Sequence, residues 1–193
     1  MQHVRYTACR DPLVRAFPEG VIDPWLRSIS FHNGEELLSV LTYYATHPQS
    51  YYRREMAHPD FPGMAREARQ HLMDATHIHF TGAGGNIGAG KYNDGSPANR
   101  PVLAMRVADA MRAALENAET FSITSDDVGW EVEPVTLPPG DHLQETALID
   151  ILDDAGADLA DRKRAARHLA FLRRCRQGPP IDIGCLRLGE ARV

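Results

Sequence analysis

The sequence has little cysteine and no long apolar run. Its three cysteines, Cys9, Cys175 and Cys185, show no CxxC spacing, which argues against a structural zinc knot. An odd number leaves at least one thiol unpaired, so a reduced state is the simpler expectation. No apolar stretch is long enough to span a membrane. Residues 1–10 also lack the apolar core of a signal peptide.

An excess of basic charge is lacking too. The formal net charge is -5 at pH 7, whereas nucleic-acid binders usually present a basic face. We therefore expect no nucleic-acid partner, and the basic stretch over residues 162–176 is typical of a solvated helix face. With 43% hydrophobic and 24% charged residues, the composition is that of a globular protein.

Hydrophobic periodicity predicts a hairpin followed by alternating helices and strands. Asn33-Gly34 separates two apolar runs and is a strong hairpin turn signal. Residues 60–63 are predicted to form a turn, and Asp141 and Asp158 to cap helices. The predicted strands are residues 25–31, 37–45, 76–81, 121–124, 130–137 and 181–188, and the predicted helices are residues 64–73, 101–118, 143–152 and 159–176. This order favours an α/β (mixed α+β) fold, with a mixed β-sheet and packed helices in one domain over residues 1–193.

His47 is the first candidate for chemistry. It stands where a strand ends and a loop begins, because Pro48 cannot continue a β-ladder. A strand end is rigid enough to aim an imidazole at a metal ion, and the loop leaves room for a substrate. The alternative is a histidine that caps backbone groups, and the local pattern alone favours that alternative.

His77 and His79 form a second candidate. Residues two apart on a strand point to the same face, so both rings could reach one ion. The alternative is a pair of polar side chains on a solvated face, with Ile78 and Phe80 on the buried face. The local pattern again favours the alternative.

A glycine-rich loop follows the strand that carries these histidines. Residues 85–91 (GNIGAGK) match the GxxxxGK part of a phosphate-binding loop. Tyr92 stands where that motif needs Ser or Thr, however, and turn residues follow where it needs a helix. Nucleotide binding is therefore the weaker alternative. We expect instead the wall of a substrate pocket, built from backbone N–H groups, and its expected residues are Gly85, Asn86, Gly88 and Lys91.

Several of these segments together resemble the neutral/alkaline non-lysosomal ceramidase family. The resemblance rests on residues 43–52 (YYATHPQSYY), on the DFPG segment that follows, and on residues 84–103, and it covers most of residues 17–118. It implies a zinc-dependent amidohydrolase that cleaves the amide of N-acylsphingosines, with zinc held by histidines, a glutamate and a tyrosine. His47 matches the histidine of the family's His-Pro segment, so the resemblance makes it the expected zinc ligand.

The sequence departs from the family pattern in three places. Gly88 stands at the position of the family's serine and has no side chain. Nothing in residues 1–25 matches the family's upstream His-x-His segment, and Glu190 lacks the Pro-Gly-Glu context of the glutamate ligand. We therefore expect part of a larger hydrolase domain, with its N-terminal and C-terminal parts missing and little activity of its own.

The resemblance also defines the expected partners. It implies a lipid or N-acyl amide as the small-molecule substrate. Sheet edges left uncovered in a partial domain would favour self-association. The alternative to an enzyme is a non-catalytic binding module that keeps the fold, which Gly88 favours.

Overall fold

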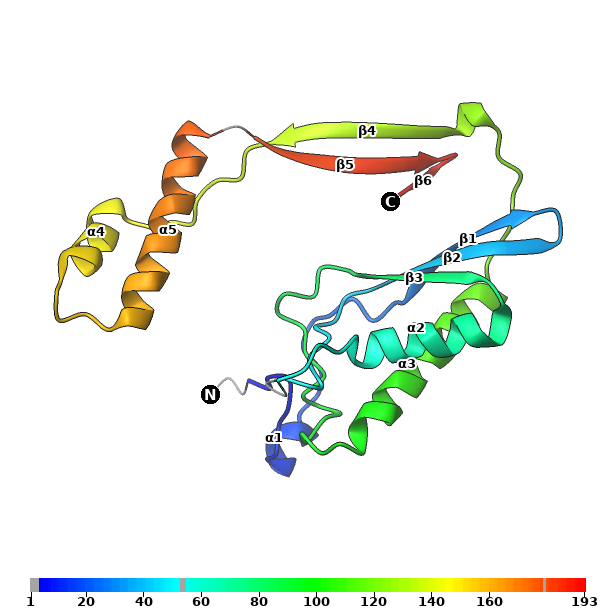
Figure 1. The fold of residues 1–193 in the computed structure, drawn as a ribbon, viewed down its shortest axis with the longest axis horizontal. Coiled ribbons are helices and arrows are strands. Elements are labelled where there is room, and N and C mark those ends of the chain that lie inside the picture. Colours follow the sequence, from blue (N-terminus) through cyan, green and yellow to red (C-terminus); the bar gives the residue numbers. More distant parts are fainter. Residues whose placement is uncertain (1–3, 53–54, 179) are drawn as a thin grey trace. The chain divides into compact units, whose positions relative to one another are not determined.

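The computed structural model describes residues 4–52, 55–178 and 180–193 (Figure 1). The chain divides into two compact units, Met1–Thr120 and Phe121–Val193. We expected one domain over residues 1–193, whereas the buried apolar side chains gather in two separate clusters, one in each unit. Both units combine helices with strands, which confirms the mixed α/β class.

The first unit contains a three-stranded mixed sheet in the order β1-β2-β3. β1 (Arg27–Asn33) pairs antiparallel with β2 (Glu36–Tyr44), and β2 pairs parallel with β3 (Thr76–Thr81). The predicted hairpin is confirmed, but its turn lies one residue later than expected. Gly34 has a φ of 59°, a conformation that glycine adopts without steric cost.

Helices α2 (Asp60–Met73) and α3 (Asn99–Glu116) lie on one side of this sheet (Figure 1). α2 supplies the crossover that a parallel pair of strands needs. Residues 60–63 therefore form its first turn, and the turn predicted there is wrong. A short helix, α1 (Pro12–Ala16), was not predicted, although Asp11 caps it and proline opens it. The core between α2 and α3 consists of Phe61, Ala65, Leu103, Ala104, Val107 and Met111.

The face of the sheet covered by the helices carries the two histidines of β3. His77 pairs with the fully buried Val40 and is only 3% exposed. Ile78 and Phe80 point the other way and are 42% and 45% exposed. The expectation of a solvated histidine face is therefore wrong, because the register with β2 places the polar side chains of β3 under the helices and the apolar ones outside.

The second unit is built on an antiparallel sheet in the order β4-β5-β6. Its strands are β4 (Val128–Val135), β5 (Ile181–Leu188) and β6 (Ala191–Arg192). Between β4 and β5 the chain forms α4 (Glu145–Asp153) and α5 (Leu159–Gln177). These two helices pack around Leu143, Leu148, Ala165, Leu169 and Leu172.

Side-chain capping explains where some helices of the second unit begin, but not where α4 begins. Asp158 accepts a hydrogen bond from the Ala160 N–H and caps α5, as predicted. Asp141 does not cap α4, whose N-cap position is Gln144. Residues 121–124 form no strand, because Thr124 closes a capping box on the 3-10 helix η1 (Ser125–Asp127).

No helix in the described parts of the chain combines the length and the apolar character needed to cross a membrane.

Candidate functional site

His47 lies three residues beyond the end of β2 and is held from two directions. Its backbone N–H donates to the Ile87 carbonyl at 2.8 Å, and its Nδ1 lies 2.9 Å from the Gly84 carbonyl oxygen. A carbonyl oxygen only accepts, so Nδ1 carries a proton, and in the neutral form of the ring the lone pair is on Nε2. Metal-binding histidines commonly use this arrangement, in which a backbone carbonyl fixes the tautomer and the ring orientation.

The contact between His47 and Gly84 depends on the absence of a side chain at residue 84. A Cβ on Gly84 would lie 2.8 Å from the backbone nitrogen of Thr46 and 3.0 Å from its carbonyl carbon. Real Cβ atoms do not approach backbone so closely. Glycine therefore lets the loop after β3 lie directly against the segment after β2, and this brings the Gly84 carbonyl to the imidazole.

A cavity of about 710 Å³ lies in the first unit beside the glycine-rich loop. Asn86, Gly88 and Lys91 of the predicted pocket wall line it, while Gly85 is exposed and does not. His47 is not among the lining residues, although its neighbours Thr46 and Ile87 are. Apolar side chains form most of the remaining wall, including Val21, Ile22, Tyr44, Phe61, Leu103 and Val107.

The ammonium group of Lys91 contacts backbone and side-chain oxygens of the N-terminal segment. Its Nζ donates to the Phe17 carbonyl at 2.5 Å and to the Arg15 carbonyl at 3.5 Å, and it lies 3.9 Å from a carboxylate oxygen of Glu19. The next helix, α3, begins only at Asn99. Lys91 thus ties the N-terminal segment to the loop, and the loop lacks the directly following helix N-terminus of a phosphate-binding loop.

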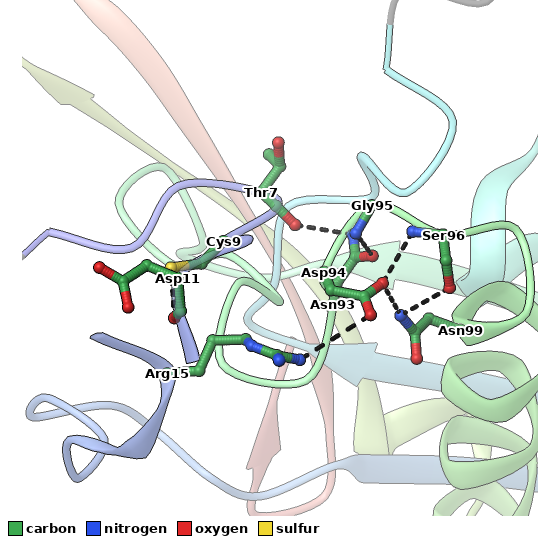
Figure 2. Close-up of polar contacts among 9 residues, drawn as sticks. All are labelled: Thr7, Cys9, Asp11, Arg15, Asn93, Asp94, Gly95, Ser96 and Asn99. Atoms are coloured by element: carbon green, nitrogen blue, oxygen red, sulfur yellow. Dashed lines mark hydrogen bonds and ion pairs between the residues drawn. The ribbon is translucent and has the colours of Figure 1, made fainter. Parts of the chain in front are cut away.

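A buried asparagine adds a second tie between these segments (Figure 2). Asn93 is 2% exposed, and its side-chain amide donates to the Thr7 carbonyl at 2.8 Å. Its backbone carbonyl accepts the Cys9 N–H at 2.9 Å. The neighbouring Asp94 faces the Arg15 guanidinium at 4.0 Å (Figure 2). Val4, Arg5 and residues 19–22 of this N-terminal segment supply one wall of the cavity.

His77 and His79 are placed together but away from the lining of the cavity. Neither ring nitrogen of His77 has a hydrogen-bond partner among the described residues, while Nδ1 of His79 lies 3.0 Å from the Thr42 hydroxyl. Burial lowers the pKa of both histidines, and the charges of Arg69 and Arg66 lower that of His77 further. Both rings are therefore neutral at pH 7.

Within the described residues, no three His, Cys, Asp or Glu side chains are grouped closely enough to hold a metal ion. Comparison with protein-family models, with curated proteins and with solved structures finds no significant match. The case for a function therefore rests on the residues of the site.

Proposed function

We propose that the first unit contributes a zinc ligand, His47, and a pocket wall to an amidohydrolase site that resembles that of the neutral/alkaline ceramidases. The substrate class would be a lipid or another N-acyl amide. One observation supports this proposal above the others. The Gly84 carbonyl oxygen lies 2.9 Å from Nδ1 of His47, which selects the tautomer of the neutral ring whose Nε2 lone pair can bind a metal ion.

The residues of this chain would supply one zinc ligand and one wall of the pocket in such a site. Zinc, when bound, polarises the amide carbonyl and lowers the pKa of a bound water. His47 would hold the ion, Gly84 would fix the ring, and the glycine-rich loop would shape the pocket with its backbone N–H groups. Catalytic zinc sites normally use three protein ligands. With one visible ligand, we expect little or no hydrolysis of ceramide or simple N-acyl amines by this chain.

Zinc affinity tests the proposal without requiring turnover. A competition titration against a chromophoric chelator compares the wild type with His47→Ala and with His71→Ala, a control on the exposed last turn of α2. We expect the His47 variant to bind zinc at least tenfold more weakly, since a ligand matters more than the outer-shell groups that cost 10- to 100-fold. The control should bind as the wild type does. Equal affinity in all three proteins would refute the zinc site.

A non-catalytic binding module is the second candidate, and Gly88 favours it. A Cβ at this position would lie 3.5 Å from the Tyr6 carbonyl oxygen, an ordinary contact, so packing does not demand glycine there. A protein of this kind would bind the amide without cleaving it. Binding of an N-acyl amine that is unaffected by His47→Ala, together with no zinc uptake, would favour this candidate over the first.

A further inference from the structure

The charged residues that line the cavity are mostly basic. They are Arg5, Lys91 and Arg106, with Glu19 as the single acid, although acidic residues outnumber basic ones 26 to 21 in the whole chain. A cavity that reverses the balance of charge of its own protein favours an anionic ligand.

Carboxylates compensate little of this positive charge. Arg5 donates to the carbonyls of Val14, Phe17 and Pro18 at 2.6–3.0 Å. Carbonyl groups accept three hydrogen bonds from its guanidinium but do not neutralise its charge. Glu19 is already engaged by the Tyr92 hydroxyl and by Lys91. The cavity lining thus contains three cations and one carboxylate.

Arg106 is the cation with hydrogen-bonding capacity to spare. The residue is exposed, its guanidinium carbon lies 4.8 Å from the centre of the Tyr92 ring in a cation–π contact, and its N–H groups donate to no acceptor among the described residues. No carboxylate among the described residues pairs with it. The planar fork of an arginine matches the two oxygens of a carboxylate.

An apolar wall lies next to this guanidinium. Leu103 and Val107 are four residues apart on α3, so they share a helix face, and Arg106 lies beside them at the cavity. Phe61 from α2 completes a floor whose three side chains are only 2–7% exposed. The cavity therefore joins a buried apolar floor to an arginine that pairs with no carboxylate of the described residues.

We infer that this cavity binds an amphiphile whose apolar chain ends in a carboxylate, and that Arg106 binds the carboxylate. The binding itself requires no zinc. The inference rests on the proposed function only where it states that the bound ligand is hydrolysed. An N-acyl amino acid would be the substrate, and water would split its C–N bond to give the fatty acid and the free amino acid.

Isothermal titration of the zinc-free chain tests this inference. The ligands are octanoate, N-octanoylglycine and octyltrimethylammonium, all below their micellar concentrations. At least one carboxylate should bind tenfold or more tightly than the cation. Lengthening the acyl chain of that carboxylate by two methylenes should raise its affinity about tenfold, because each buried methylene contributes about 0.8 kcal/mol. Arg106→Gln should weaken the binding of that carboxylate about fivefold or more.

The matched control is Arg112→Gln. Arg112 lies on the same helix and pairs with Glu116 at 2.6 Å, and it does not line the cavity. This variant should bind both carboxylates as the wild type does. Tighter binding of N-octanoylglycine would identify an acylated amino acid as the ligand, and tighter binding of octanoate a free fatty acid.

Two results would overturn the inference. One is equal binding of the anionic and cationic amphiphiles, and the other is carboxylate binding that Arg106→Gln leaves unchanged. Because zinc is absent from the titration, failure of the zinc site would not remove carboxylate binding. Likewise, a chain that binds zinc but does not bind carboxylates would refute this inference and leave the proposed zinc site standing.

Discussion

Asp60 shows how a single side chain positions the segment that follows His47. It is 5% exposed and has a φ of 56°, unusual for a residue other than glycine. Its carboxylate accepts the N–H groups of Ser50, Tyr51 and Phe61 at 2.8–2.9 Å, and the Ser50 hydroxyl as well. Burial alone would raise the pKa of Asp60, but these hydrogen bonds outweigh burial and hold it below its usual value.

Asp60→Asn keeps the shape and tolerates the positive φ, but it removes the charge that these donors face. We expect the free energy of unfolding at pH 7 to fall by about 2 kcal/mol, measured by urea denaturation. A lowered pKa stabilises the native state above the unfolded value of about 3.9, and this stabilisation disappears as the pH falls through the native pKa. The difference between variant and wild type should therefore shrink below about pH 4.

Asp74→Asn is the matched control for Asp60→Asn. Asp74 also has a positive φ, of 50°, but its side chain is exposed at the end of α2. Its replacement should change the stability by less than about 0.5 kcal/mol. Equal losses in the two variants would show that backbone conformation, and not the buried carboxylate, causes the effect.

Residue-scale prediction from sequence was strongest where the signal is local. Pro48 marks the end of a strand, so the position of His47 could be predicted. Its partner Gly84 is 37 residues away in the sequence, so no local sequence pattern predicts the contact between them. For His77 the alternation of polarity gave the wrong face, because pairing with β2 and coverage by α2 override a preference for solvent.

At the scale of elements, the glycine-rich loop offers a comparison between two adjacent glycines. Gly84→Ala forces a Cβ against the backbone of Thr46, so the segments after β2 and β3 must separate. We expect a loss of about 1–3 kcal/mol in the free energy of unfolding. Hydrogen exchange should also become faster at the His47 N–H, which bonds to Ile87.

Gly85→Ala is the control for Gly84→Ala. A Cβ at residue 85 would have no atom within 4 Å, and its φ is not positive. This variant should therefore be neutral, or more stable by up to about 1 kcal/mol through a less flexible unfolded chain. Similar losses in both variants would contradict the close approach of the loop to residue 46.

Element types were predictable where periodicity extends over many residues. The strands over residues 76–81 and 181–188 have the predicted bounds, and α3 lies within two residues of its predicted bounds. The failures are short segments. Residues 121–124 carry too few alternations to outweigh the capping box of Thr124, and residues 60–63 look like a turn because of a proline that the first helical turn accommodates.

At the scale of the molecule, the division into two units was not predictable from composition. No run of proline, glycine or serine marks the boundary near residue 120. Each unit nevertheless has its own buried apolar cluster. The expected self-association stays a prediction, and the exposed Ile78 and Phe80 provide an apolar surface for it.

The buried histidines predict that acid destabilises the first unit more than the second. The native pKa values of His77 and His79 are lowered, whereas an unfolded histidine titrates near 6.5. Below about pH 6.5 the unfolded chain therefore binds protons that the native unit does not. As the pH decreases below this value, the free energy of unfolding should decrease by up to about 1.4 kcal/mol per pH unit for each histidine. Proton uptake by His77 would also place its charge near Arg66 and Arg69.

Hydrogen-exchange mass spectrometry at pH 7.5 and 5.5, corrected for the intrinsic exchange rate, can follow peptides of α2 and α3 separately from peptides of α5. The opening free energy of the first set should fall on acidification more than that of the second set. His77→Leu fills the same buried site without a titrating group, so it should remove about half of the pH dependence in α2 and α3. An unchanged dependence in this variant, or an equal fall in both sets of peptides, would mean that groups other than these histidines control the acid response.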